Sequence, residues 1–73
     1  VGIAHRLKHE IFDAIRQIRD GGVAILMAEQ DALSALRIAD RAYVLEHGHV
    51  ARHGPVAELS QDDHIRQIYL GVA

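Results

Sequence analysis

The sequence contains no cysteine and no long apolar run. The absence of cysteine excludes a disulfide-stapled scaffold and a cysteine-ligated zinc site. The longest uncharged apolar run, residues 23–28, is far shorter than the roughly 20 residues of a membrane-spanning helix, so no direct membrane insertion is expected. Basic residues number 8 and acidic residues 10, and the resulting net charge of −2 does not favour nucleic-acid binding.

The chain is also short. Of its 73 residues, 49% are apolar and 25% charged, which is typical of a soluble globular domain and unlike a disordered chain. A chain of this length buries only about 60% of its unfolded surface, so its stability alone is marginal. The chain begins with Val1 rather than Met, which we interpret as a sign that an earlier part is missing.

The first expected element is a helix. Apolar positions recur every three or four residues at Leu7, Ile11, Ile15 and Ile18, and charged residues occupy the other face. Two glycines at residues 21–22 follow the last of these positions and are a typical helix stop. The pattern predicts a helix over residues 5–20.

Residues 23–28 are apolar at every position. A half-exposed strand would alternate, so this continuous run predicts a strand covered on both faces, as in a parallel sheet. Asp31 is placed to cap a following helix over residues 32–39. The order helix, strand, helix, strand favours an α/β fold with parallel strands.

The rest of the chain predicts a β-hairpin and small helices. Residues 42–46 and 49–53 are expected to pair as antiparallel strands around a two-residue turn, His47-Gly48. Gly54-Pro55 is expected to open a short helix with Pro at its first position.

Ser60 and Asp63 then have the spacing of a capping box that would begin the last helix. The small helices are therefore assigned to residues 55–71.

The predicted strand at residues 23–28 makes the chain look incomplete. Its composition calls for strands on both edges, yet only the strand at residues 42–46 is available as a neighbour. An unpaired apolar edge is an aggregation site that natural proteins avoid. Either another copy of the chain pairs with this edge, or upstream strands have been lost, and we favour the loss.

An ordered set of short motifs runs from Gly2 to Gly71. The motifs are Gly2-Ile3-Ala4, Ile11-Phe12, GVAILMAEQD at residues 22–31, ADRAYVLE at residues 39–46, Gly54-Pro55, AEL at residues 57–59 and IYLG at residues 68–71. Together they resemble the C-terminal third of an ABC-transporter ATPase, most of all an ATPase subunit of the branched-chain amino acid importer. The resemblance covers nearly the whole chain and implies the C-terminal part of a P-loop nucleotide-binding domain.

The resemblance also implies roles along this partial domain. Residues 1–5 correspond to the D-loop, residues 23–31 to a core strand and the switch loop, residues 42–53 to the hairpin and residues 55–71 to the C-terminal helices. Gln30 falls where most ABC ATPases carry a His that senses the γ-phosphate, and it is the candidate catalytic residue. The expected nucleotide and dimer-interface residues are Val1, Gly2, Ile3, Ala4, Glu29 and Asp31.

Two positions depart from the family pattern. Gln30 replaces the usual His, although the branched-chain amino acid subfamily often has Gln there. A Gln side chain can donate a hydrogen bond to a phosphate oxygen but cannot carry a positive charge. His5 stands where the subfamily usually has Pro, so this D-loop lacks the fixed start that Pro gives a helix.

The 73 residues contain no G-x-x-x-x-G-K-[ST] phosphate loop. The Q-loop, the signature sequence and the Walker B acids that the resemblance leads one to expect are also absent. Phosphoryl transfer depends on such Lys and Mg²⁺ contacts. We therefore expect ATP and Mg²⁺ to serve the parent protein, and the fragment alone to be inactive and without a cofactor.

Six histidines raise the alternative of a metal site. His49 and His53 would lie about 13 Å apart along a strand, too far to share one ion, and His47 sits in the turn. His5 and His9 lie one above the other on a helix, but no third ligand is evident beside them. No metal site is predicted.

The combined prediction is a fragment of the ATP-hydrolysing subunit of an ABC importer for branched-chain amino acids. The expected partners are a second ATPase subunit and membrane permease subunits, with the ATPase peripheral on the cytoplasmic face of the inner membrane. Two alternatives stay open. One is the ATPase of a urea or amide importer, and the other is a stand-alone, non-enzymatic interaction module that docks through its open strand edge.

Overall fold

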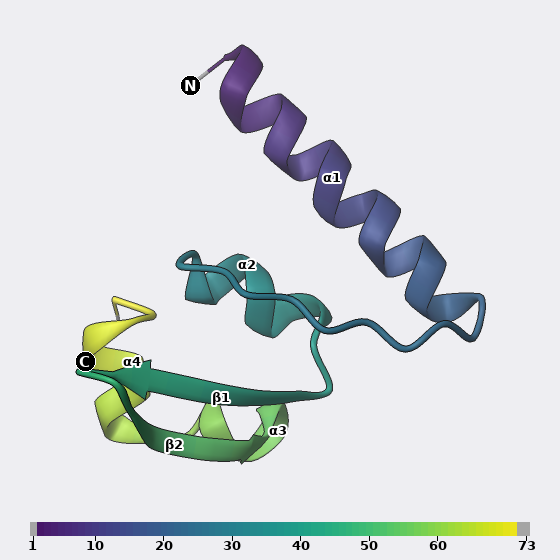
Figure 1. Cartoon of the computed structure of the whole chain (residues 1–73). Helices are drawn as coiled ribbons and strands as arrows, with labels where there is room; N and C mark the ends of the chain where they lie inside the picture. Colours follow the sequence, from purple (N-terminus) through teal and green to yellow (C-terminus); the bar gives the residue numbers. More distant parts are fainter. Residues whose placement is uncertain (1, 72–73) are drawn as a thin grey trace.

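The computed structural model describes residues 2–71, and Val1, one of the expected interface residues, lies outside them. The elements in this part are, in order, α1 (Ile3–Asp20), α2 (Ala32–Ile38), β1 (Arg41–Glu46), β2 (His49–Pro55), α3 (Val56–Leu59) and α4 (Asp63–Ile68). Figure 1 shows α1 as a long rod on one side of α2, with the hairpin and the two last helices on the other side. Within the described range, no helix is both long and apolar enough to cross a membrane.

Helix α1 confirms the first predicted helix, with an earlier start. It begins at Ile3 rather than at residue 5, so Ile3 and Ala4 belong to its first turn rather than to a loop. It ends where the glycines predict. The amide of Gly21 donates to the carbonyls of Gln17 and Ile18, and Gly22 turns the chain away with a φ of 99° that is accessible to glycine.

No strand forms at residues 23–28 of the described structure, where the sequence predicted one. The segment runs between α1 and α2 without regular structure, and no described backbone hydrogen bond involves residues 24–28. A strand exists only through its ladder of hydrogen bonds to a neighbour. Because the described chain offers this segment no such neighbour, most of its apolar side chains stay exposed, including Val23, Ile25 and Leu26.

Parallel strands are likewise not present in the part of the chain that the structure describes. The only described sheet has two strands, β1 and β2, and they are antiparallel. The fold is therefore a small α/β arrangement in which the hairpin is the only sheet found among residues 2–71.

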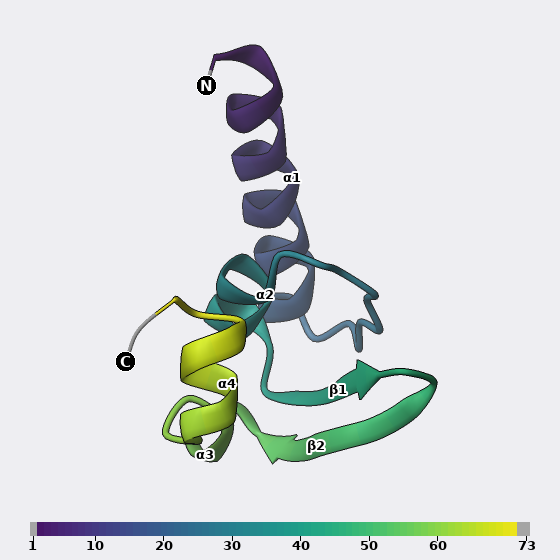
Figure 2. The same ribbon diagram turned by 90° about the vertical axis from the view of Figure 1, so that its left-hand side faces the viewer.

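The two N-terminal helices run in the same direction. Lys8 of α1 forms an ion pair with Asp31 at the start of α2, and Arg19 near the end of α1 donates to the carbonyl of Ile38 at the end of α2. Residues 21–31 must therefore run back along the pair before α2 begins, as the loop between them does in Figure 1; Figure 2 shows the same loop beside α2 in a second view. Helix α2 confirms the prediction for residues 32–39, including its cap at Asp31.

The predicted hairpin and its turn are confirmed. His47 and Gly48 both have positive φ angles, 52° and 77°, which is the two-residue turn whose twist suits paired strands. The pairing passes from Val44 with Arg52 to Leu45 with Val50, which leaves Ala51 as an extra residue on β2. This β-bulge, which increases the local twist, was not predicted.

The small C-terminal helices form, but their caps differ from the prediction. Pro55 ends β2 and precedes α3 as its N-cap instead of occupying the first helical position. Asp62, and not Ser60 in a capping box, caps α4 by accepting a hydrogen bond from the amide of Ile65. Asp62 is the cap because it directly precedes the first residue of α4. Its carboxylate also forms an ion pair with Arg52 of β2 at 3.1 Å.

A carboxylate on the hairpin also holds α4. Glu46 at the end of β1 accepts hydrogen bonds from the imidazole of His64, at 2.8 Å, and from the hydroxyl of Tyr69. The bond from Tyr69, followed by that from His64, lowers the pKa of Glu46, and the same contact raises the pKa of Tyr69. The hairpin and the last helix thus form one small unit.

The hydrophobic core of the described chain is small. Only Leu59 and Ile65 are buried hydrophobic residues, at 5% and 1% exposure. The chain exposes 5826 Å², whereas a compact monomer of 8.1 kDa exposes about 4500 Å². Large apolar residues on α1 and along residues 23–28 account for much of the exposed apolar surface. They are Ile3, Leu7, Ile11, Ile18, Val23, Ile25 and Leu26.

Two isoleucines on α4 provide a matched test of this core. Ile65→Ala removes a fully buried side chain and should destabilise the hairpin unit by about 2–4 kcal/mol. Ile68→Ala makes the same chemical change at a position that is 59% exposed, and should cost much less. Hydrogen exchange of the β1 and β2 amides measures both. Equal protection in the two variants would contradict the placement of Ile65 in the core.

Candidate functional site

The loop that precedes α2 is held by its own carboxylates. Oε1 of Glu29 accepts a hydrogen bond from the amide of Gln30 at 2.9 Å and from the amide of Asp31 at 3.1 Å. One side chain therefore folds the backbone of all three residues into a tight turn. Residues 29–31 thus lie in a loop directly before α2.

Asp31 is the most connected residue of this loop. Its Oδ1 accepts from the amide of Ser34 at 3.2 Å and its Oδ2 from the hydroxyl of Ser34 at 2.7 Å. The ammonium of Lys8 lies 3.0 Å from the same Oδ2. The hydroxyl of Ser34 is the largest cause, followed by Lys8, of a pKa for Asp31 that falls to about 2, because each contact favours the charged carboxylate.

Gln30 presents its side chain to solvent. The residue is exposed, and the described hydrogen bonds use only its backbone amide. A primary amide can donate two hydrogen bonds and accept others. The backbone of Gln30 is held by Glu29, and its exposed side-chain amide can form hydrogen bonds with a polar group that approaches the loop.

The expected interface residues at the chain start lie at the N-terminal end of α1. Gly2 precedes the helix with a φ of 95° and caps it without a side-chain hydrogen bond. Ile3 and Ala4 are exposed in the first turn. The Lys8–Asp31 ion pair places this end of α1, rather than its far end, next to the loop of residues 29–31.

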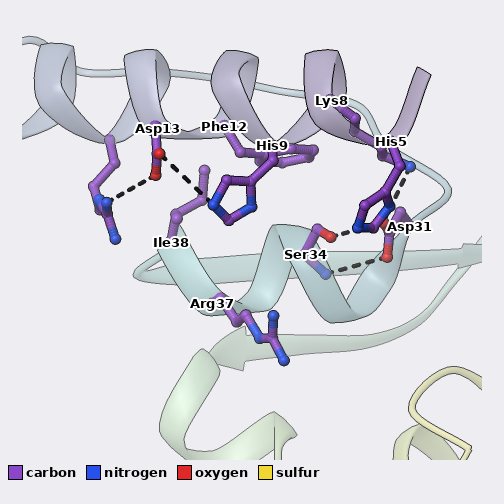
Figure 3. A pocket seen from close by; sticks show the side chains of 10 residues that line it. His5, Lys8, His9, Phe12, Asp13, Asp31, Ser34, Arg37 and Ile38 are labelled. Carbon is purple, nitrogen blue, oxygen red and sulfur yellow. Dashed lines mark hydrogen bonds and ion pairs between the residues drawn. The ribbon is translucent and has the colours of Figure 1, made fainter. Parts of the chain in front are cut away.

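A groove of about 510 Å³ separates α1 from α2 (Figure 3). Its lining residues are His5, Lys8, His9, Phe12, Asp13, Arg16, Asp31, Ser34, Arg37 and Ile38. Most of its charges are already paired, Lys8 with Asp31 and Arg16 with Asp13. The groove is therefore a polar contact between the helices and does not have the apolar lining typical of a small-molecule pocket.

The histidines do not assemble a metal site in the residues that the structure covers. His5 and His9 both line the groove, but His9 faces Asp13, with 3.8 Å between Nε2 and Oδ2. His53 stacks on Tyr43 with ring centroids 5.3 Å apart. Among residues 2–71, no group of three or more His, Asp or Glu side chains could hold a metal ion.

Sequence reasoning missed Lys8 and Ser34. Ser34 carried a usable signal, because a Ser three residues after a helix-capping Asp is placed to meet its carboxylate. Lys8 carried none. It belongs to a charged helix face that predicts only solvation, and its partner Asp31 is far away in the sequence.

Comparison with known proteins gives consistent matches. No family profile matches the chain. A high-affinity branched-chain amino acid transport ATP-binding protein of Pseudomonas aeruginosa, BraG, is 42% identical over 97% of the chain. The lipopolysaccharide export system ATP-binding protein LptB of Escherichia coli K12 is 35% identical over 78% of the chain. A probable branched-chain amino acid transport ATP-binding protein of Archaeoglobus fulgidus, LivF, is 38% identical over 85% of the chain.

The chain is much shorter than these relatives. The matched residues make up 30% of the Pseudomonas protein, 24% of the Escherichia protein and 27% of the Archaeoglobus protein. The 73 residues therefore correspond to less than a third of each relative.

The contacts of Asp31 predict a pH dependence at the start of α2. Its folded pKa of about 2 lies below the ordinary value of 3.8. The ionised side chain therefore contributes stability that is complete above about pH 4 and is lost as the pH falls towards 2. Titration of the Asp31 carboxyl carbon by NMR should give the low pKa.

Asp31→Asn is the control for this titration. Asn caps helices about as well as Asp but does not ionise. The variant should keep α2. Its stability should lose the pH dependence that Asp31 causes between about pH 4 and pH 2. A carboxyl that titrates near 3.8, or an unchanged pH dependence in the variant, would count against the described contacts.

Proposed function

We infer that the chain belongs to the ATP-binding proteins of ABC transporters, and we propose that its parent protein is the ATP-hydrolysing subunit of an importer for branched-chain amino acids. The observation that carries the proposal is the match to the Pseudomonas protein, at 42% identity over 97% of the chain. The Archaeoglobus relative has the same kind of name. Relatives named for lipopolysaccharide export and ribose import are 33–37% identical, below the 42% of the Pseudomonas protein.

Gln30 is the residue of this chain that we assign to the reaction. Its exposed amide can donate a hydrogen bond to an oxygen of the terminal phosphate, or hold the attacking water, without adding charge. Glu29 contributes indirectly, because its side chain fixes the backbone of the loop that carries Gln30. Asp31 anchors the same loop to α2.

ATP and Mg²⁺ need more than this chain provides. The 73 residues contain no phosphate-binding loop, and within the described residues no cluster of three potential ligands could bind a metal ion. The parent protein would hold the nucleotide through residues outside these 73, and Gln30 would approach from one side. The 73 residues alone are therefore expected to lack ATPase activity.

The exposed apolar surface supports an origin within a larger domain. Leu26 is 100% exposed, and Val23 and Ile25 of the same segment are exposed as well. In the parent, this segment would become a strand paired on both edges, which would bury its side chains and satisfy its backbone. The chain exposes roughly 1300 Å² more than a compact monomer of its mass, which is enough surface for such a contact.

The proposed partners follow from the same assignment. A second ATPase subunit would meet the segment formed by residues 1–4 together with the loop of residues 29–31, and membrane permease subunits would receive the resulting movement. The assembly would place the ATPase on the cytoplasmic face of the inner membrane as a peripheral subunit.

A stand-alone interaction module is the second candidate. The observation in its favour is the same exposed apolar surface, which a partner protein could cover. Light scattering on the purified 73-residue chain separates the two. A stable monomer or defined dimer with a cooperative melt favours the module, whereas aggregation and a broad melt favour the domain fragment.

The transport assignment is tested in the full-length parent protein, reconstituted with its permease in vesicles. Leucine should stimulate ATP hydrolysis and be taken up, and urea should do neither. Gln30→Ala should lower hydrolysis by about a hundredfold, as expected when a donor to a developing charge is lost. Gln30→His should retain most of the activity.

Two results would contradict the assignment. Hydrolysis by Gln30→Ala at the parent rate would remove Gln30 from the reaction. Stimulation by urea rather than leucine would move the transporter to the urea or amide class.

A further inference from the structure

One ion pair joins α1 to the candidate loop. The ammonium of Lys8 lies 3.0 Å from the Asp31 carboxylate, as Figure 3 shows. The other described ion pairs of α1 stay within or at the end of that helix: His9–Asp13, Arg16–Asp13 and Arg19–Asp20. Arg19 also contacts α2, but at the opposite end, through the carbonyl of Ile38. Among the described residues, Lys8 is therefore the side chain whose ion pair connects the first turns of α1 to the loop of residues 29–31.

A displacement of Asp31 would be transmitted to Gln30. The two residues share a planar peptide unit, and the carboxylate of Glu29 binds the amides of both. The carboxylate of Asp31 cannot follow Lys8 freely, because Ser34 holds both of its oxygens. Lys8 therefore acts on a compact turn that moves as one piece with the start of α2.

Lys8 also reduces the net negative charge around Gln30. Gln30 is neutral, and its neighbours Glu29 and Asp31 are both carboxylates. An approaching phosphate would meet repulsion from these groups. The ammonium of Lys8 offsets the charge of Asp31 at a distance of 3.0 Å, so the turn presents less negative charge where Gln30 is exposed.

We propose that Lys8 is a positioning residue for the ATPase reaction, which sets the location of Gln30 and neutralises Asp31 through the ion pair between α1 and the loop. This inference rests on the proposed function, since it assigns Lys8 to the same site. Lys8 touches neither nucleotide nor water in this role, and acts through Asp31 and Gln30. It also links the end of α1 that carries Gly2–Ala4 to the loop of residues 29–31.

The test uses the full-length parent protein with four single variants. Lys8→Met removes the charge and keeps the length of the side chain, and Lys8→Arg keeps the charge. Arg6→Met is the matched control, because Arg6 is exposed on the same helix and has no ion pair among those described. Gln30→Ala serves alone and combined with Lys8→Met.

We expect Lys8→Met to lower kcat about fivefold, as befits a half-exposed ion pair, with the KM for ATP unchanged. Lys8→Arg should restore the rate, and Arg6→Met should match the parent. In the Gln30→Ala background, Lys8→Met should cause no further loss, because Lys8 acts through Gln30. An unchanged kcat in Lys8→Met, or an equal loss in the Gln30→Ala background, would overturn the proposal.

Hydrogen exchange separates this proposal from the proposed function. Lys8→Met should increase exchange at the amides of Gln30, Asp31 and Ser34, and Arg6→Met should not. If the parent does not hydrolyse ATP, the proposed function fails and the catalytic role of Lys8 fails with it, while faster exchange would still support the placement of the loop by Lys8. If the parent hydrolyses ATP and Lys8→Met alters neither kcat nor exchange, the proposal for Lys8 alone fails.

Discussion

The carboxylate of Asp31 links α1, α2 and the loop of residues 29–31 at one end of the N-terminal half. It caps α2 through Ser34 and pairs with the ammonium of Lys8 from α1. The backbone amide of the same residue donates to the carboxylate of Glu29. The direction of the two helices, the groove between them and the location of Gln30 all depend on these contacts. These contacts are ion pairs and hydrogen bonds between half-exposed side chains. The packing of α1 on α2 therefore depends on charge more than on buried apolar area.

The C-terminal half is organised by a different interaction. Ile65 of α4 is buried, and the hairpin is joined to the region of α4 by the contacts of Glu46 with His64 and of Arg52 with Asp62. Local contacts of this kind form without help from distant parts of a chain. The two halves thus differ in their packing: the hairpin unit has a small core of its own, whereas α1 and residues 23–28 expose much of their apolar surface.

Most of the elements could be predicted from the sequence because their signals are local. Helical spacing and Gly21-Gly22 give α1, Asp31 gives the start of α2, and His47-Gly48 gives the turn of the hairpin. The strand expected at residues 23–28 does not form in this chain. An apolar run indicates only a preference for burial, and a strand also needs a hydrogen-bonding neighbour. The Lys8–Asp31 pair escaped prediction because it is created by the packing of α1 on α2, which no local pattern records. The cap of α4 went to Asp62 rather than Ser60 because both are good capping residues and the choice depends on where the preceding turn ends.

The small core has a consequence for how this segment can vary between related proteins. Side chains that are buried within the segment restrict substitution wherever it occurs, and here that restriction applies to Leu59 and Ile65. Positions such as Leu26 or Leu7, which are exposed in the segment itself, carry no such internal restriction. If Leu7 and Leu26 stay apolar across homologues, the selection on them must come from contacts with a surface outside this segment. The exposed positions that stay apolar would then identify the part of this segment that contacts another surface.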